Sequence, residues 1–250
     1  MILKNFASEI FNKITLALPQ NLETKKYLKI LGTKKIIYIG NIKYYGHKTY
    51  LSQKNKKLFN QLKKFKVWCA GSTHNTEEII ISKLNKELKK TEPRLLTIII
   101  PRHVNRSEDI RNDLEKFGLN IVSHSSRPKI SKDTDIYLVD TFGETSNFYN
   151  LSNISFMGGS IVNHGGQNPL EAARLGNYII NGPNIGNFKE IYDYLEKNKI
   201  SYTTSNILRM RDKVLLKMNK KLSLTKRRKI FDNGNKILDK NINFIEKFIQ

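Results

Sequence analysis

The sequence has little of what builds disulfides, turns or membrane spans: among 250 residues it has one cysteine, six prolines and one tryptophan. Cys69 excludes an internal disulfide, and its place in the apolar run VWCA predicts a buried, inert thiol in a reducing compartment. No run of about 18 uncharged apolar residues is present, and the start MILKNFASEIFNKI lacks the apolar block of a signal peptide. We therefore expect a globular cytoplasmic protein.

Acidic residues are also scarce, since 22 Asp and Glu stand against 44 Lys and Arg, a net charge of +22. The excess lies at the ends, because residues 1–70 hold 15 basic and 2 acidic residues and 205–250 hold 13 and 4, whereas 71–204 hold 16 of each sign. A neutral middle argues against a nucleic-acid groove on the main fold. Basic ends suit an anionic membrane surface, and a solvated lysine-rich surface is the equal alternative.

Short apolar runs alternate with amphipathic stretches from Val67 onward, which predicts a parallel sheet with helices on both faces, an α/β Rossmann-like fold. Glu77 and Glu78 fall in a first helical turn, where the helix dipole favours them. Gly118 and Gly176 fall where helix C-caps are expected. We predict strands at 67–70, 95–100, 121–124, 136–140, 154–158 and 178–180, and helices at 76–90, 107–117, 169–175 and 188–197.

The two flanks have a different pattern from this middle. Residues 1–66 predict a helical start, a strand at 35–40 (KIIYIG) and a flexible link at 48–66. Helices are expected at 206–218 and 222–250. The second of these carries a partly apolar stripe that needs a partner surface, formed by Ile230, Ile237, Ile242, Ile245 and Ile249.

Polar and glycine-rich clusters directly follow the predicted strands. They are AGSTH (70–74), PRH (101–103), DTFGE (140–144), GGS (158–160) and NGP (181–183). The carboxyl ends of parallel strands meet at one edge of a sheet, where such folds bind ligands. We therefore expect a ligand site at this edge.

Two of these clusters favour an anionic ligand. Ser72 and Thr73 stand between a strand and a helix, where hydroxyls, backbone N–H groups and the helix dipole attract an anion, although both residue types are also ordinary N-caps. Arg102 follows a strand directly, and its planar fork of donors suits phosphate or carboxylate. A pair with a neighbouring acid, or exposure to solvent, is the alternative for this arginine.

Metal binding is not favoured by the sequence. His74 and His103 occupy equivalent loop positions, but no carboxylate or thiolate at ligand spacing accompanies them. Asp133 and Asp135 form an Asp-x-Asp pattern like that of some metal-dependent glycosyltransferases. Because the pattern precedes a strand, at the opposite edge of the sheet, we interpret it as a solvated turn.

The stretch GGSIVNHGGQNPLEAARLG (158–176) is the most informative one. Its two glycine pairs would let the backbone approach a ligand closely, and Asn168 is expected to cap a helix with Pro169 at its first position. Glu171 then falls in the first turn, where it could accept hydrogen bonds from ribose hydroxyls or simply complement the dipole. Glu144 has the same two interpretations.

Taken together, these motifs resemble the bacterial 3-deoxy-D-manno-octulosonic acid (Kdo) transferases, two-domain glycosyltransferases of the GT-B class. The resemblance covers about residues 5–200. Gln167 and Ala172 depart from it, since the family more often has His and Pro there. The matching segments are GNIK (40–43), STHNTEE (72–78), PRHVNR (101–106), DTFGE (140–144), FMGGSIVNHGGQNPLEAA (156–173) and GPNIGNF (182–188).

The resemblance implies that residues 66–204 form the C-terminal, Rossmann-like domain that binds CMP. Residues 1–65 would be the end of the acceptor domain plus a linker, and 205–250 would be C-terminal helices. The implied CMP contacts are Pro101, Arg102, Phe142, Gly143, Glu144, Asn168, Pro169, Leu170 and Glu171. Further donor contacts are expected at Ser72, Thr73, His74, Gly159 and Ser160, with no metal and no cofactor.

The implied reaction is an inverting, metal-independent transfer of Kdo from CMP-Kdo to a lipid A precursor in lipopolysaccharide synthesis. The family's catalytic base lies in an N-terminal domain that residues 1–45 match only at its end, so we expect no catalytic residue here and no activity of the chain alone. The implied partners are CMP-Kdo, the lipid A precursor, the anionic cytoplasmic face of the inner membrane and a separately encoded N-terminal half, but no nucleic acid.

Two alternatives remain open from the sequence. One is another GT-B enzyme that uses a UDP-sugar, which competition between CMP and UDP would distinguish. The other is a non-catalytic basic protein that binds nucleic acid or membrane through its ends. Salt-dependent binding to nucleic acid without a response to CMP would favour that second alternative.

Overall fold

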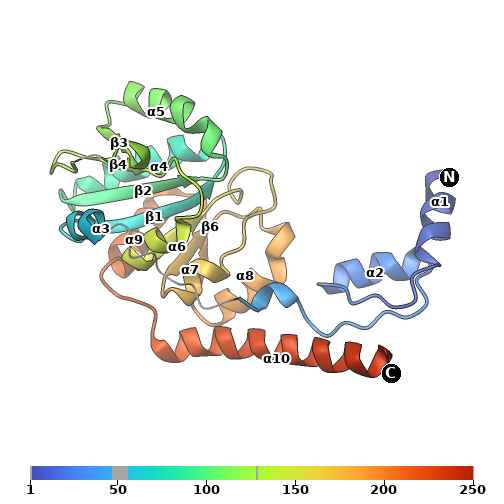
Figure 1. Ribbon diagram of the computed structural model, residues 1–250. Helices are drawn as coiled ribbons and strands as arrows, with labels where there is room; N and C mark the ends of the chain where they lie inside the picture. Colours follow the sequence, from blue (N-terminus) through green and yellow to red (C-terminus); the bar gives the residue numbers. More distant parts are fainter. Residues whose placement is uncertain (1, 47–55, 128, 250) are drawn as a thin grey trace. The chain divides into compact units, whose positions relative to one another are not determined.

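The computed structural model describes residues 2–46, 56–127 and 129–249 (Figure 1). The chain divides into two compact units, which we describe separately. The terminal unit comprises Met1–His47 together with Arg228–Gln250, and the sheet unit comprises Lys48–Arg227. The segment limits at 65 and 204, which the resemblance implies, stay predictions.

Within the described residues, the sheet unit is built on seven parallel strands in the order β3-β4-β2-β1-β5-β6-β7. The α/β parallel fold and the six expected strands are thus confirmed. The short seventh strand was not predicted, because its three residues carry almost no apolar signal. The strands are β1 Lys66–Thr73, β2 Leu95–Pro101, β3 Ile121–Ser123, β4 Ile136–Leu138, β5 Ile154–Met157, β6 Tyr178–Asn181 and β7 Ser201–Thr203.

Helices lie on both sides of this sheet (Figure 1). Helices α4 (Glu77–Lys89), α5 (Ser107–Lys116), α7 (Leu170–Arg174) and α8 (Lys189–Lys197) confirm the four expected ones within a residue or so. Helix α6 was missed because its sequence TSNFYNL lacks a clear helical pattern. The remaining helical segments of the unit are α3 Lys56–Leu62, η2 Val104–Arg106, η3 His124–Ser126, α6 Thr145–Leu151, η4 Gly186–Phe188 and α9 Ile207–Lys217.

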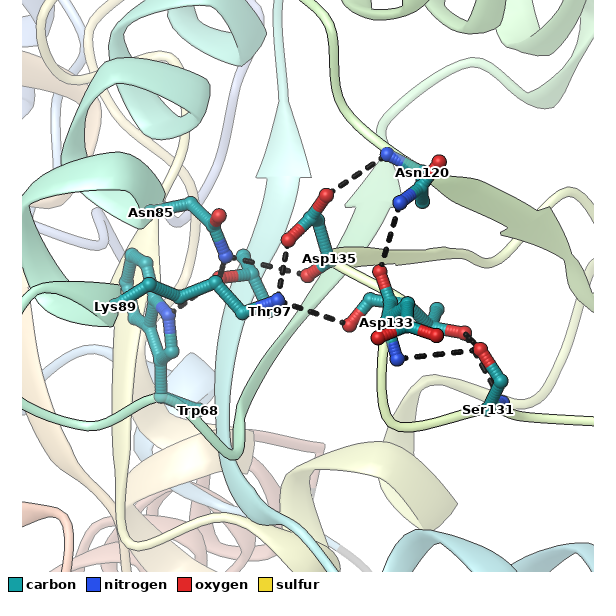
Figure 2. Close-up of polar contacts among 9 residues, drawn as sticks. Trp68, Asn85, Lys89, Thr97, Asn120, Ser131, Asp133 and Asp135 are labelled. Carbon is teal, nitrogen blue, oxygen red and sulfur yellow. Dashed lines mark hydrogen bonds and ion pairs between the residues drawn. The ribbon is translucent and has the colours of Figure 1, made fainter.

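The core holds a polar network at the amino-terminal edge of the sheet (Figure 2). Thr97 Oγ1 accepts hydrogen bonds from Trp68 Nε1 and from Asn85 Nδ2, both at 2.8 Å. Asp135 pairs with Lys89 and accepts the Asn120 backbone N–H at 2.8 Å. The Asp135 side chain is only 13% exposed, so our interpretation of this stretch as a solvated turn was wrong for Asp135, which joins β4 to its neighbours.

Two expectations for the amino-terminal flank were wrong. The predicted strand at 35–40 forms only an isolated bridge between Ala17 and Ile36, because no neighbouring strand extends the pairing. The predicted flexible link at 48–66 contains helix α3, whose Leu62 is fully buried and which is followed by the start of β1. Residues 48–55 of that link lie outside the described residues.

The terminal unit contains α1 (Ile2–Phe11), α2 (Leu22–Ile30), η1 (Ile42–Tyr44) and residues 228–249 of α10 (Leu224–Ile249). Helix α10 packs on the segment 35–45: Gly234 lies against the Tyr44 carbonyl, and Ile237 lies against Gly40. The predicted apolar stripe therefore finds part of its partner surface within this unit. None of the described helices is long and apolar enough to cross a membrane.

Candidate functional site

The direction of chain progression reverses between β1 and β5. The chain moves from β1 to β2, then to β3 at the edge of the sheet and back to β4 between β3 and β2. It then returns to β5 on the other side of β1 and continues to β6 and β7. All these strands are parallel, so their carboxyl ends share one edge, and such a reversal is where open α/β sheets bind ligands. The predicted clusters follow β1, β2, β4, β5 and β6 at this edge.

A buried carboxylate occupies the centre of this edge. Glu77, which is fully buried, accepts the backbone N–H groups of His74 and Gly159 through Oε2 at 2.9 and 2.7 Å. Its Oε1 accepts those of Ser160 and Ile161 at 3.1 and 3.0 Å. The loop amides that could cradle a phosphate therefore already hold a carboxylate. Sequence reasoning saw in Glu77 only a favourable dipole, and its place in the first helical turn was the available signal.

The glycine-rich loop after β5 is tied to the protein rather than open to a ligand. A Cβ at Gly158 would lie 2.0 Å from the Ser72 carbonyl oxygen, so the lack of a side chain here allows the backbone at the end of β1 to pack closely against the loop. Ser160 is fully buried; its hydroxyl donates to the Met157 carbonyl at 2.5 Å and accepts the Gly182 N–H at 2.8 Å. The expected donor contacts of Gly159 and Ser160 stay predictions, but the observed bonds of both are internal.

Three histidines from three strand-end loops converge here. The His74 ring lies 4.1 Å from that of His164 and 6.2 Å from that of His103, between ring centroids. Burial, followed by the nearby cations, lowers the pKa of His74 from 6.5 to about 4. The departure at Gln167 has a local role, since its Nε2 lies 3.1 Å from His74 Nε2. The sequence did not single out His164.

This histidine cluster is not arranged as a metal site. In the part of the chain that the structure describes, no group of three or more His, Cys, Asp or Glu side chains is placed to hold a metal ion. Two cationic side chains, Arg102 and Arg106, lie close enough to the cluster that their positive charge helps to lower the pKa of His74. The arrangement suits an anion better than a cation.

Arg102 and Arg106 differ in how they are held. Arg106 pairs with Glu78 at 3.2 Å, and the Glu78 side chain is only 4% exposed. The Arg102 side chain is exposed and forms no ion pair with any described residue, while its backbone N–H bonds the Thr73 carbonyl at 3.0 Å. The alternative of a neighbouring acid is thus not realised among the described residues, and the guanidinium is available to an anion.

Thr73 is fully buried and Ser72 has φ of 54°, a left-handed conformation that fixes the loop.

The loop after β4 meets the start of α7. The Ser146 hydroxyl, two residues after DTFGE, donates to Glu171 Oε1, so the segments that carry these two motifs come together. Helix α7 begins at Leu170, one residue later than expected, but Asn168 Oδ1 still accepts the Leu170 N–H at 3.0 Å.

The other predicted CMP contacts differ in exposure. Buried ones are Pro101, Pro169 and Leu170, whereas Phe142 is 79% exposed and Gly143 has φ of 83°.

Glu144 borders a groove of about 1400 Å³ beside β3 and β4. His124 Nε2 lies 3.6 Å from Glu144 Oε2, and the Ser125 backbone N–H donates to Asp140 at 2.8 Å, so the loops after β3 and β4 are joined. Cationic side chains border the same groove, at Lys64, Arg94, Arg127, Lys129 and Lys132. Sequence reasoning did not single out His124.

Sequence comparison identifies relatives over the whole chain. The chain is 32% identical over 256 residues to the 3-deoxy-D-manno-octulosonic acid transferase of Rickettsia felis. This alignment covers 100% of the chain and 53% of the Rickettsia protein. It is 34% identical over 197 residues to the Haemophilus influenzae transferase of the same name, covering 77% of this chain and 46% of that protein. The chain is a homologue of the Kdo transferases. It spans about half the length of the curated relatives it matches, and no family model matches it.

Two solved structures share the fold of this Kdo transferase homologue. The C-terminal CMP-Kdo-binding domain of WaaA from Acinetobacter baumannii is 25% identical, with a TM-score of 0.60, over 73% of this chain and 96% of that domain. A glycosyltransferase from Rickettsia africae, 15% identical with a TM-score of 0.60, covers 100% of this chain and 67% of that one and shares the fold. The resemblance inferred from the motifs and the GT-B C-terminal fold class are both confirmed.

Proposed function

We propose that the sheet unit binds CMP-Kdo and supplies the donor site for Kdo transfer in lipopolysaccharide synthesis. One observation carries the proposal: Arg102, which pairs with no acid among the described residues, the histidine cluster and the Glu171–Ser146 contact all lie at the carboxyl edge of one sheet. The relatives named Kdo transferase and the WaaA domain named CMP-Kdo-binding supply the ligand's identity. The UDP-sugar alternative is not favoured by them.

In the proposed reaction, the bond between the anomeric carbon of Kdo and the CMP phosphate breaks, and a bond from that carbon to an acceptor hydroxyl forms. The electron pair leaves with CMP, so negative charge grows on its phosphate. We propose that Arg102 stabilises that charge, because an exposed guanidinium without an acidic partner among the described residues can form charge-assisted hydrogen bonds with phosphate oxygens. We propose an inverting course that needs no metal.

The proton of the acceptor hydroxyl needs a base, which we propose lies in an N-terminal half outside this chain, so that the chain alone is inactive. The acceptor would be a lipid A precursor at the cytoplasmic face of the inner membrane, approached through the basic ends. The terminal unit offers apolar side chains that such a half could cover, each more than half exposed: Phe6, Leu22, Tyr27, Ile30, Ile42 and Ile249.

Calorimetry with CMP tests the donor site. Wild type should bind, and Arg102→Ala and Glu171→Ala should each weaken binding by about tenfold or more, the worth of a hydrogen bond to a charged group. Arg209→Ala and Glu196→Ala, which remove exposed charges elsewhere in the sheet unit, are matched controls and should bind as wild type. No heat from wild type, or equal binding by all four variants, would overturn the proposal.

UMP, UDP and RNA in the same assay address the alternatives. Binding that prefers UDP would favour a UDP-sugar enzyme. Salt-sensitive binding to RNA without a response to CMP would favour a charge-only binder.

A further inference from the structure

His124 is held rigidly at the end of β3. The residue is buried at 7% exposure, and it lies in the turn η3 directly after the strand. The Phe148 ring packs edge-on against its imidazole at 5.3 Å between centroids, and the Tyr137 ring packs at 5.8 Å. A buried histidine fixed by two rings has little freedom to turn, so the directions of its two nitrogens are set by the fold.

Each nitrogen of this ring faces one polar partner. Nδ1 lies 2.8 Å from the Tyr137 hydroxyl, and Nε2 lies 3.6 Å from Glu144 Oε2. Burial, followed by the charges of Asp140 and Glu144, raises the pKa of Tyr137, so its hydroxyl keeps its proton and can donate it to Nδ1. A neutral imidazole that accepts at Nδ1 carries its own proton at Nε2, the atom that faces Glu144.

Two polar side chains lie next to the Glu144 carboxylate, on the side of His124. Its Oε2 faces the His124 ring and is also within 3.5 Å of Asn147 Nδ2. The same carboxylate lines the groove beside β3 and β4. The loops carrying Arg102 and Glu144 follow the neighbouring strands β2 and β4 at the same edge of the sheet, so a nucleotide whose phosphate binds Arg102 can extend its base toward Glu144.

We propose that His124, itself held by Tyr137, is a positioning residue that fixes the Glu144 carboxylate as the acceptor for a cytosine amino group. This inference rests on the proposed function and adds the origin of its base selectivity. A carboxylate accepts a hydrogen bond from the 4-amino group of cytosine, whereas uracil presents a carbonyl oxygen at that position and repels it. The Tyr137–His124–Glu144 relay therefore selects CMP over UMP.

The test compares the binding of CMP and UMP by calorimetry. Tyr137→Phe removes only the hydroxyl, and His124→Gln keeps a donor but loses the ring held between Tyr137 and Phe148. Each should weaken CMP binding by about three- to tenfold and leave UMP binding unchanged, because misplacing one charged hydrogen bond costs about that much. Tyr178→Phe removes a hydroxyl from a buried tyrosine of β6 and is the matched control. Thermal unfolding verifies that each variant is folded.

The same substitutions in a Glu144→Gln background separate positioning from general stability. If His124 acts through Glu144, Tyr137→Phe and His124→Gln have no further effect on CMP binding there. An equal loss of CMP and UMP binding, or a loss that persists in this background, would contradict the inference. Wild type that binds CMP, with loss in Arg102→Ala but an unchanged CMP-to-UMP ratio in both folded variants, would leave the proposed function standing and refute only the positioning role.

Discussion

The Glu77 carboxylate accepts a hydrogen bond from the Gly159 backbone N–H at 2.7 Å, although 82 positions separate the two residues in the chain. Three further backbone N–H groups, of His74, Ser160 and Ile161, point at the same carboxylate. The first turn of α4 and the loop after β5 are thus fastened to each other across the β1–β5 reversal. Four donors on one buried side chain make Glu77 the structural centre of the candidate site.

Replacing Glu77 with Gln should destabilise the sheet unit. The amide would turn a donor toward backbone donors and leave some of them buried and unbonded, so we expect a loss of about 2–4 kcal/mol in the free energy of unfolding. Urea unfolding measures it. Glu115→Gln, which breaks an exposed pair with Arg111, is the control and should cost about 0.5 kcal/mol or less. Equal unfolding curves for the two variants would refute this role of Glu77.

Gly158→Ala should also destabilise the fold, for a steric reason. The added Cβ would lie 2.0 Å from the Ser72 carbonyl oxygen, a backbone atom that can move only if the ends of β1 and β5 separate. We expect a cost of about 1–3 kcal/mol, measured by thermal or urea unfolding. Gly186→Ala is the matched control, because nothing lies within 4 Å of its Cβ position, and a similar loss there would contradict the steric argument.

Protonation of His74 should make the fold sensitive to acid. The pKa of His74 is lowered from 6.5 to about 4, chiefly by burial, so between these values the unfolded chain binds a proton that the folded chain refuses. The contribution of neutral His74 to the free energy of unfolding is therefore fully present above pH 6.5 and is lost as the pH drops toward 4. In NMR titration the His74 ring should remain neutral at pH 5.5, and His74→Gln should lose less stability than wild type between pH 7 and 5. A His74 midpoint near 6.5 would contradict this prediction. Bound CMP should raise the midpoint of the His74 titration.

Gly234→Ala sets two effects against each other in α10. Alanine favours a helix by about 1 kcal/mol over glycine, but its Cβ would lie 2.2 Å from the Tyr44 carbonyl oxygen. Because the obstacle is backbone, we expect the clash to win and the terminal unit to exchange its amide protons faster. The exposed neighbour Asn235→Ala gains helix propensity without a clash, so it should slow exchange slightly. Slower exchange in Gly234→Ala would show that propensity prevails.

The sheet could be predicted from the sequence because its strands are buried on both faces and appear as apolar runs. LLTIII and ISFM became β2 and β5 with nearly the expected bounds. The same signal misled at KIIYIG, since an apolar run forms a strand only where a neighbouring strand is available. Helices α3 and α6 were missed because packing rather than periodicity holds them, as the contact between Phe59 and Phe148 at 6.2 Å illustrates.

The candidate site was predictable where chain order alone decides. Parallel strands bring their carboxyl ends together, so the sequence alone assigns the loops carrying Arg102, Glu144 and Glu171 to one edge. Contacts between loops could not be assigned. That Glu77 fills the amides after β5, and that His124 faces Glu144, depends on how the loops cross in space, which residue type and spacing do not encode.

The terminal unit is assembled from both ends of the chain, with Gly234 and Ile237 of α10 packed against the segment 35–45. On the ribosome, this segment emerges long before its partner, since every strand of the sheet unit is synthesised between them. The sheet unit can fold during synthesis, as domains generally do, before α10 is available to pack on the segment 35–45. The segment 35–45 is therefore made before every strand of the sheet unit but completes its packing only after them.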